Sequence, residues 1–204
     1  MAFSPFKLLD YFTFGKNRVI QEKEKLADEV HALSESLIPW NRKDAELLSY
    51  GCSEKKIDKE DSAKGIFVSI YEEPMMAFSA KHFNRAKLIK MTMASTANHK
   101  LFYHQTPKSI QCYLNDQQIG YLTADYKFYN MKKRLAGRIN SGGDDSYSKI
   151  VYKDVELGLI NPLSFDSPFN KRVFDMIKDN LSAEEEIILI CMTFYYLIDK
   201  ISSQ

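Results

Sequence analysis

The sequence predicts a β-rich α+β fold, in which an antiparallel closed barrel of about ten to twelve strands surrounds a buried hydrophobic C-terminal helix. Three observations predict this fold. Apolar residues follow a period of two from about residue 64 onward, a hairpin pattern with a glycine in its second strand recurs, and the run from Ile187 to Ile198 is apolar on almost every helical face. The 13 phenylalanines and 12 tyrosines also suit strands better than a helical bundle.

The C-terminal helix carries a start signal. Ser182 is followed three residues later by Glu185, which is the capping-box pattern, and Glu184 to Glu186 put negative charge where a helix N-terminus favours it. A bilayer span needs about 20 apolar residues, and the apolar run of this helix is shorter. A helix without a polar face belongs inside a protein, so we expect other elements to surround it.

Residues 1–63 are predicted to be an N-terminal extension made of an aromatic arm, an amphipathic helix and a charged linker. In residues 1–15 aromatic and polar side chains alternate. Such an arm is either an interfacial membrane anchor or a segment packed on its own domain or on a partner subunit, and the lack of dense Lys and Arg favours packing. The charged run 55–64 contains no aromatic residue and is the linker candidate.

Residues 17–38 are predicted to form the amphipathic helix, which Pro39 ends. Its apolar face has two rows, formed by Val19, Leu26 and Leu33 and by Val30 and Leu37. This face either lies on the surface of its own domain or pairs with a second copy in a homo-oligomer. Most apolar helix faces pack within their own chain, which favours the first interpretation.

The barrel domain is predicted to span residues 64–204. Its strand candidates are 65–71, 75–80, 88–94, 100–104, 109–114, 119–122, 149–152 and 157–160. Asn115-Asp116 and Lys153-Asp154 separate two such segments at corresponding places, which indicates hairpin turns. A short amphipathic helix across the barrel mouth is predicted from apolar residues at helical spacing, which are Phe169, Val173, Phe174 and Ile177.

An internal repeat supports a closed barrel. The second strand of each hairpin reads apolar-Gly-x-apolar around Gly120 and Gly158, and the same phrase occurs at Gly137. Glycine inside a strand suggests a tight bend or the close approach of another backbone, and consecutive curved hairpins are what a closing barrel requires. A barrel of about eight strands is filled by its own side chains, whereas a wider one needs the C-terminal helix as a filler.

From about Lys64 to Ile201 this pattern resembles the tubby C-terminal-like superfamily, which includes the phospholipid scramblases and the plant LURP-one-related proteins. The resemblance rests on the serial hairpins with the Gly120 and Gly158 phrases and on the hydrophobic helix that follows; it is architectural, and no diagnostic motif accompanies it. It implies a barrel of roughly twelve strands around a central C-terminal helix. It also implies binding of phosphoinositide head groups or a link to lipid and calcium, although no acidic loop has EF-hand spacing.

Composition argues against several classes of function. The net charge of +1 provides no global field for nucleic acid. Cys52, Cys112 and Cys191 are odd in number and scattered, which favours a reducing compartment. No signal peptide is recognisable, so we predict a cytoplasmic protein, with a position peripheral to the membrane as a further option.

Motifs for catalysis and metal binding are missing. His82, His99 and His104 do not have the spacing of metal ligands. The acidic stretch Gly142 to Asp145 is more simply a turn than a catalytic loop, and Cys52 has no candidate base near it in the sequence. We therefore predict no catalytic residue, no metal and no cofactor.

One cluster of basic and aromatic residues is the candidate ligand site. Its basic residues are Lys127, Lys132, Lys133, Arg134 and Arg138, and the aromatic residues among them are Tyr126, Phe128 and Tyr129. Such a face can hold phosphate groups at a membrane surface or on single-stranded nucleic acid. A second basic group is predicted to share the face and consists of Lys81, Arg85, Lys87 and Lys90. The alternative interpretation is a solvated strand edge protected by lysine.

Three hypotheses about function follow, in this order of preference. The first is a non-enzymatic binding or interaction module that recognises anionic lipid head groups or phosphate-bearing ligands through the basic and aromatic face. The second is an assembly protein that oligomerises through its N-terminal helix. The third is a hydrolase or transferase whose site is assembled only in space.

Overall fold

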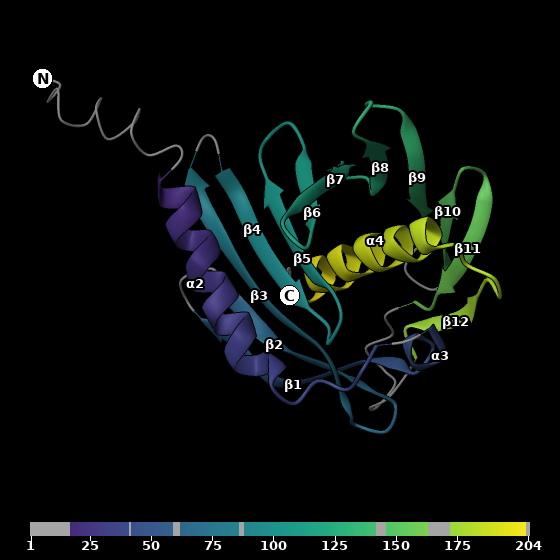
Figure 1. The fold of residues 1–204 in the computed structure, drawn as a ribbon, viewed down its shortest axis with the longest axis horizontal. Coiled ribbons are helices and arrows are strands. Elements are labelled where there is room, and N and C mark those ends of the chain that lie inside the picture. The colour runs from purple at the N-terminus through teal and green to yellow at the C-terminus, as the bar shows by residue number, and fades with distance from the viewer. Residues whose placement is uncertain are drawn as a thin grey trace, which may run out of the picture.

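The computed structural model describes residues 17–40, 42–58, 62–85, 88–141, 146–162 and 172–202. The aromatic arm predicted at residues 1–15 and the turn predicted at residues 142–145 lie outside these ranges. Within these ranges, three helices, α2 (Asn17–Ser34), α3 (Arg42–Ala45) and α4 (Ala183–Ser202), accompany a 12-stranded sheet (Figure 1). The strands are β1 (Leu48–Asp58), β2 (Ser62–Ser69), β3 (Pro74–Arg85), β4 (Leu88–Ser95), β5 (Lys100–Gln105), β6 (Ile110–Leu114), β7 (Gln117–Leu122), β8 (Lys127–Asn130), β9 (Leu135–Asn140), β10 (Ser148–Tyr152), β11 (Val155–Ile160) and β12 (Phe174–Ile177).

The sheet is an antiparallel meander that curls into a nearly closed barrel. Each strand from β2 to β11 pairs with the strands before and after it in the chain. Strand β1 meets the residues just before β12 through an antiparallel bridge between Ser49 and Arg172, and the Val173 amide donates a 2.7 Å hydrogen bond to the Leu48 carbonyl oxygen. The predicted fold class, a barrel of ten to twelve antiparallel strands with a C-terminal helix and an N-terminal helix, is confirmed.

The hairpin turns that shape the barrel use the predicted residues. Asn115 and Asp116 have φ angles of 47° and 67°, and Lys153 and Asp154 have 46° and 64°. Two consecutive positive φ angles give the tight turn whose twist matches that of the flanking strands, and Asn and Asp tolerate this conformation better than most residues. The two predicted hairpins are therefore confirmed.

Two glycines of the repeat lie where another backbone comes close. A Cβ atom at Gly120 would overlap the Tyr129 carbonyl oxygen and the Phe128 ring. A Cβ atom at Gly158 would lie 2.9 Å from the Met176 carbonyl oxygen. The repeated glycines thus allow β7 and β11 to bend against the next strand, as the sequence predicts.

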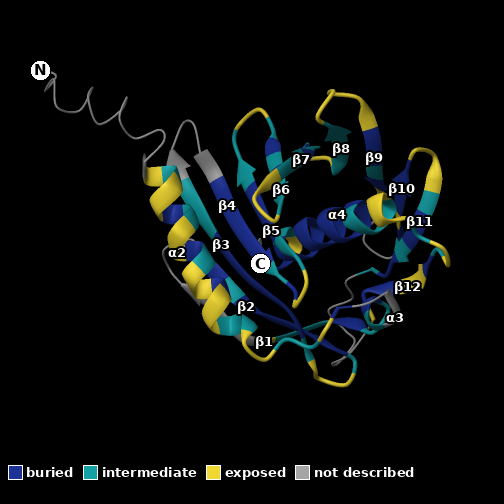
Figure 2. Ribbon diagram, viewed as in Figure 1, coloured by how far each residue is buried: buried dark blue, intermediate teal, exposed yellow. Residues whose placement is uncertain are grey.

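Helix α4 lies inside the barrel and is buried without interruption from Ile188 to Ile198 (Figure 2). Contacts reach it from several parts of the wall. The Tyr103 hydroxyl on β5 donates a 2.7 Å hydrogen bond to the Cys191 carbonyl oxygen, and Trp40 packs edge-on against Phe194 with 5.3 Å between ring centroids. A helix in such a place can bury every face, which explains why its sequence has no polar side.

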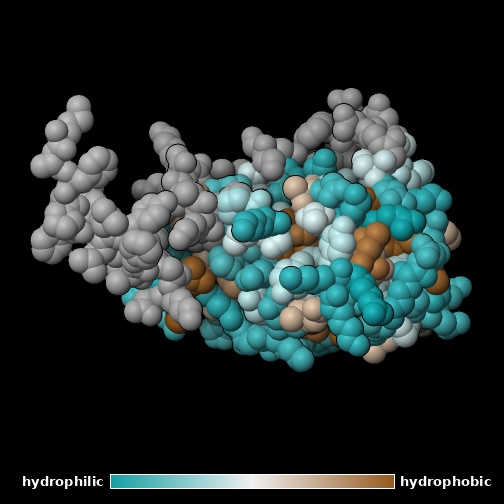
Figure 3. Space-filling model, turned by 90° about the horizontal axis from the view of Figure 1, so that it is seen from above, coloured by the Kyte–Doolittle hydropathy of each residue, from teal (hydrophilic) through white to brown (hydrophobic). Residues whose placement is uncertain are grey.

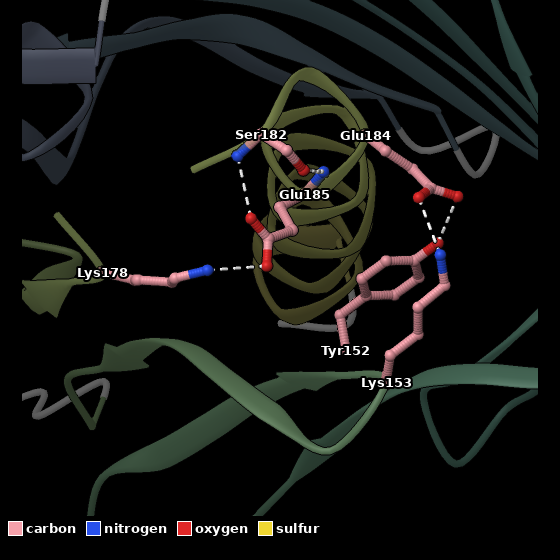
Figure 4. A network of polar contacts seen from close by, with 6 residues as sticks. All are labelled: Tyr152, Lys153, Lys178, Ser182, Glu184 and Glu185. Atoms are coloured by element: carbon pink, nitrogen blue, oxygen red, sulfur yellow. Dashed lines mark hydrogen bonds and ion pairs between the residues drawn. The ribbon is translucent and has the colours of Figure 1, made fainter. Parts of the chain in front are cut away.

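The start of α4 is the predicted capping box (Figure 4). The Ser182 amide donates to Glu185 Oε2 at 2.8 Å, and the Glu185 amide donates to Ser182 Oγ at 3.3 Å. Glu185 also accepts from Lys178 Nζ at 2.8 Å. These contacts satisfy two backbone amides at the end of the helix and fix the point at which the chain enters the barrel.

Helix α2 covers the outer face of the barrel, chiefly over β3 and β4. Leu26 and Val30 are buried in a cluster with Ile66, Ala77 and Met93 of the sheet. Neighbouring sheet residues such as Phe67 and Phe78 belong to the inner core instead, because successive side chains point to opposite faces. The strands under α2 are therefore buried on both sides.

The two rows of apolar residues on α2 thus pack within their own chain. Val19, Leu33 and Leu37 are partly buried against the same cluster. The helix ends at Ser34, before the predicted end, and the Ser34 hydroxyl donates to the Val30 carbonyl oxygen at 2.6 Å. Association of two copies through this helix stays a prediction.

Two predicted elements are wrong. Residues 55–58 and 62–64 of the predicted linker are part of the sheet, since β1 extends to Asp58 and β2 begins at Ser62; the sheet itself starts at Leu48, before the predicted boundary at residue 64. The helix predicted across the barrel mouth is strand β12, in which Phe174 and Ile177 are buried. Phe169 lies outside the described residues.

Candidate functional site

Hairpin β8–β9 brings all five predicted basic residues together. Lys127 on β8 and Arg138 on β9 are direct cross-strand partners, and the turn between the strands holds Lys132, Lys133 and Arg134. Phe128 is 1% exposed and belongs to the inner core, so its neighbour Lys127 lies on the outer face. The five basic residues therefore lie on a single hairpin, whereas two of the three aromatic residues predicted to share their face do not: Phe128 lies in the core, and Tyr126 packs against Tyr195 and Tyr196 of α4.

Two of the five cations have acidic partners. Lys127 Nζ lies 2.6 Å from Asp125 Oδ2, and Arg138 Nη1 lies 3.7 Å from Asp154 Oδ1. The hydrogen bond from Lys127 lowers the pKa of Asp125, and the same hydrogen bond raises the pKa of Lys127. These pairs leave little net charge on the strands of the hairpin.

The turn carries the charge that is not neutralised. Lys132, Lys133 and Arg134 are exposed, and no ion pair joins any of them to another described residue. The other hairpin turns within the described ranges each contain at most one Lys or Arg. Three adjacent cations without an acidic partner therefore set this turn apart.

Asn130 fixes the backbone of the turn. Its side-chain Oδ1 accepts hydrogen bonds from the amides of Lys132 at 3.0 Å and of Arg134 at 3.1 Å. Its carbonyl oxygen accepts from the Lys133 amide at 2.8 Å, and its own amide donates to the Arg134 carbonyl oxygen at 3.0 Å. Lys133 has a φ of 58°, a conformation that the surrounding bonds hold in place. The three cations thus project from a rigid base.

Two exposed hydrophobic residues flank the cations. Met131 and Leu135 are 50% and 49% exposed. We call the segment Met131–Leu135 the β8–β9 tip. Behind it, Tyr129 pairs with Leu135 on one side and with Tyr121 on the other, so a half-buried aromatic row continues across the outer face. The end of this hairpin lies at the top of Figure 1, and the view from above in Figure 3 shows small hydrophobic patches among hydrophilic side chains.

Of the second basic group, neither Lys81 nor Lys90 shares this face. Lys81 Nζ lies 3.1 Å from Glu22 Oε2 on α2, on the part of the sheet that the helix covers. Lys90, predicted at the surface, is 1% exposed and points into the barrel, which corrects that prediction. Lys87 and the side chain of Arg85 lie outside the described part of the structure.

Lys90 holds the C-terminal end of α4 to the wall. Its Nζ donates to Asp199 Oδ1 at 3.1 Å and to Ser202 Oγ at 2.6 Å, and the Tyr126 hydroxyl donates to Asp199 Oδ2 at 3.0 Å. Burial lowers the pKa of Lys90, although Asp199 opposes this effect, and burial also raises the pKa of Tyr126. These four side chains satisfy one another and join β4, a turn and α4, which makes them a structural anchor.

Sequence reasoning missed the parts that Asn130, Met131 and Leu135 play. An Asn just before a run of turn cations is a usable signal, because Asn side chains bond to backbone amides two or more residues on. Alternation along β4 does not place Lys90, because Met91 and Met93 form the more hydrophobic face of the strand and yet pack outside, under α2.

Three further features of the described residues concern metal binding, thiol reactivity and the spanning of a membrane by a helix. Within the described residues, no group of three or more His, Cys, Asp and Glu side chains is arranged to hold a metal ion. Burial raises the pKa of the Cys112 thiol, which disfavours the reactive thiolate. No helix of the described part has the length and apolarity needed to cross a membrane.

Comparison with known proteins found no matching family model, no matching curated protein and no matching solved structure. Membership of the tubby C-terminal-like superfamily therefore stays a prediction.

Proposed function

We propose that the protein is a non-enzymatic binding module that recognises phosphate-bearing anions through the β8–β9 tip. The observation that carries the proposal is the presence of three adjacent, exposed cations on a turn whose backbone is fixed by Asn130. The net charge of the chain is only +1, so any attraction for anions has to come from a local concentration of charge such as this one.

The chemistry of the three side chains fits phosphate. The Arg134 guanidinium can bind two phosphate oxygens at once, and Lys132 and Lys133 each add a mobile point charge. Near an anionic membrane surface, each Lys or Arg contributes about 1 kcal/mol of attraction. Three such residues therefore give roughly 3 kcal/mol, which corresponds to a difference in affinity of roughly 100-fold.

Binding to lipid vesicles tests the proposal. The wild-type protein is compared with the triple variant Lys132→Gln, Lys133→Gln and Arg134→Gln on neutral and on anionic vesicles, at low and high salt. A parallel titration with inositol hexakisphosphate separates a soluble phosphate ligand from a lipid head group. We expect salt-sensitive binding that the triple variant loses by roughly 100-fold.

A matched control removes three cations elsewhere. Lys25, Lys108 and Lys149 are exposed and lie away from the tip, so their replacement by Gln changes net charge equally. Binding by this control variant should stay close to wild type. Equal loss in both variants, or equal binding by wild type to neutral and anionic probes, would contradict the proposal.

A further inference from the structure

We infer that the β8–β9 tip enters a lipid bilayer: Met131 and Leu135 embed at the boundary between head groups and acyl chains, while the three cations between them contact lipid phosphates. This inference rests on the proposed function and goes further, because it commits to a membrane surface as the partner and assigns a role to the two hydrophobic side chains.

The order of residues along the tip supports a bilayer. An apolar residue stands at each end of the segment, and Lys132, Lys133 and Arg134 lie between them. Long cationic side chains can place their charged ends at lipid phosphates while apolar neighbours reach deeper. A soluble phosphate would use only the cations, whereas a bilayer interface also accepts the half-exposed Met131 and Leu135.

Exposure alone does not distinguish these two side chains. Single exposed hydrophobic residues are normal on protein surfaces, and Tyr71 and Met176 are examples here. The tip differs because its two exposed hydrophobic residues enclose the one described turn with three cations that lack an acidic partner. Apolar burial and attraction for anionic lipid therefore act at the same place, which is the combination that a reversible membrane anchor needs.

The fixed backbone of the tip favours insertion. The four hydrogen bonds around Asn130 hold the turn in one shape before binding. Ordering a flexible loop at an interface costs conformational entropy, and a preformed turn avoids most of that cost. A rigid turn at the end of a hairpin can also project its side chains without unfolding any part of the sheet.

The neighbouring hairpin turn does not repel an anionic surface. The Lys153 amide donates to the Ala136 carbonyl oxygen at 2.7 Å, which places turn β10–β11 beside the tip. Asp154 in that turn faces Arg138, and Glu184 nearby lies 2.7 Å from Lys153 Nζ, so each acid has a cation beside it. Val155, 40% exposed, follows this turn and adds apolar surface at the same end of the barrel.

A double substitution tests the inference. In Met131→Ser with Leu135→Ser, the cations and Asn130 remain. We expect partition onto anionic vesicles to weaken by about tenfold, because two half-exposed apolar side chains no longer leave water, while binding of inositol hexakisphosphate stays unchanged. The matched control, Ile20→Ser with Met176→Ser, removes two equally exposed apolar side chains elsewhere and should leave both kinds of binding unchanged.

The depth to which the tip enters the bilayer is measured with a tryptophan placed at position 131. The variant Met131→Trp should show a blue-shifted emission on anionic vesicles and quenching by lipids brominated near the head of the acyl chain. The wild-type protein is the blank, because its single tryptophan, Trp40, is buried. Emission of the new tryptophan that stays unchanged on vesicles to which the protein binds would overturn the inference.

The outcomes separate the two proposals. If the cation variant loses vesicle binding and the Met131 and Leu135 variant keeps it, the proposed function stands and insertion is wrong. If the cation variant binds vesicles and inositol hexakisphosphate as the wild type does, the proposed function is wrong, and with it the inference. Circular dichroism spectra like that of the wild type are required of each variant.

Discussion

Helices α2 and α4 lie on opposite sides of the same sheet and show how the width of an apolar surface reports its environment. Helix α4 lies inside the barrel, and every residue from Ile188 to Ile198 is buried. Helix α2, outside, buries Leu26 and Val30 and leaves other faces exposed, so that only one stripe is apolar (Figure 2). Each sequence is therefore matched to its side of the wall.

The polar contacts of the two helices differ in the same way. Inside, the side chain of Lys90 is 2% exposed and faces Asp199, whose side chain is 29% exposed. Outside, the side chain of Lys81 is 35% exposed and faces Glu22, whose side chain is 6% exposed and also lies near Arg18 and Lys25. Glu22 therefore keeps two cations if Lys81 is removed, whereas Lys90 is the one cation that faces Asp199 among the ion pairs of the described residues. The difference between inside and outside should appear in the free energy of unfolding.

The largest effect is expected from truncating the core of α4. Phe194 is 0% exposed and packs edge-on against Trp40, so Phe194→Ala leaves a cavity in the barrel and should lower the free energy of unfolding by about 3–5 kcal/mol. On α2, the partly buried Leu33 gives the comparison, and Leu33→Ala should cost about 1 kcal/mol. Urea titration measures both, and equal losses would mean that α4 is not the filler.

The two ion pairs give the next effect. Lys90→Ala removes the cation that faces Asp199 and should cost about 3 kcal/mol, at the lower end for a broken buried pair because Asp199 is 29% exposed and Tyr126 still donates to it. Lys81→Ala should cost less than about 1 kcal/mol. The same denaturant titrations measure the loss, and the ranking is contradicted if Lys81→Ala is the more damaging substitution.

A smaller effect should appear at alkaline pH. Burial raises the pKa of Tyr126 above its ordinary value of 10.0, and the same holds for Tyr103 and Tyr195, which also contact α4 or belong to it. Above pH 10 the unfolded chain loses these protons while the folded chain keeps them, so stability falls as the pH rises. Tyr126→Phe should make this fall less steep, as measured by thermal unfolding between pH 8 and about 11. An unchanged slope would argue against burial of the hydroxyl.

The smallest effect belongs to the exposed N-terminal end of α4 (Figure 4). The hydrogen bond from Lys178, together with the Ser182 amide, lowers the pKa of Glu185 from 4.5 to about 2. The resulting stabilisation is complete above pH 4.5 and is lost as the pH falls toward 2. Glu185→Gln should therefore lower the stability at neutral pH and flatten the acid side of the stability profile, so that the variant differs least from the wild type near pH 2. A variant as acid-sensitive as the wild type would contradict this assignment.

Most of the barrel could be predicted from sequence because its strands alternate clearly and its turns use Asn, Asp and Gly. Strand β1 was missed because it is the first strand of the sheet, paired along its length with β2 alone, and such a position tolerates the charged residues that resemble a linker. Strand β12 was mistaken for a helix because a register shift brings both Phe174 and Ile177 to the inner face, which mimics helical spacing.

The candidate site was predictable in position but not in detail. Five cations lie within twelve residues of sequence, so a hairpin over this stretch brings them close together. Which of them are neutralised depends on Asp154, which belongs to the next hairpin, and that contact follows from the packing of turns. The inward position of Lys90 likewise depends on the register of β4 against the barrel interior, and net charge or composition could not reveal it.

Hydrogen exchange followed by mass spectrometry tests the helix-filled barrel most directly. Amides within Ile188–Ile198 can exchange only when the barrel opens, so they should exchange with the free energy of global unfolding. Amides of α2 lie on the outside and should exchange faster, through local opening. Exchange in α4 that is as fast as in α2 would contradict a C-terminal helix enclosed by the sheet.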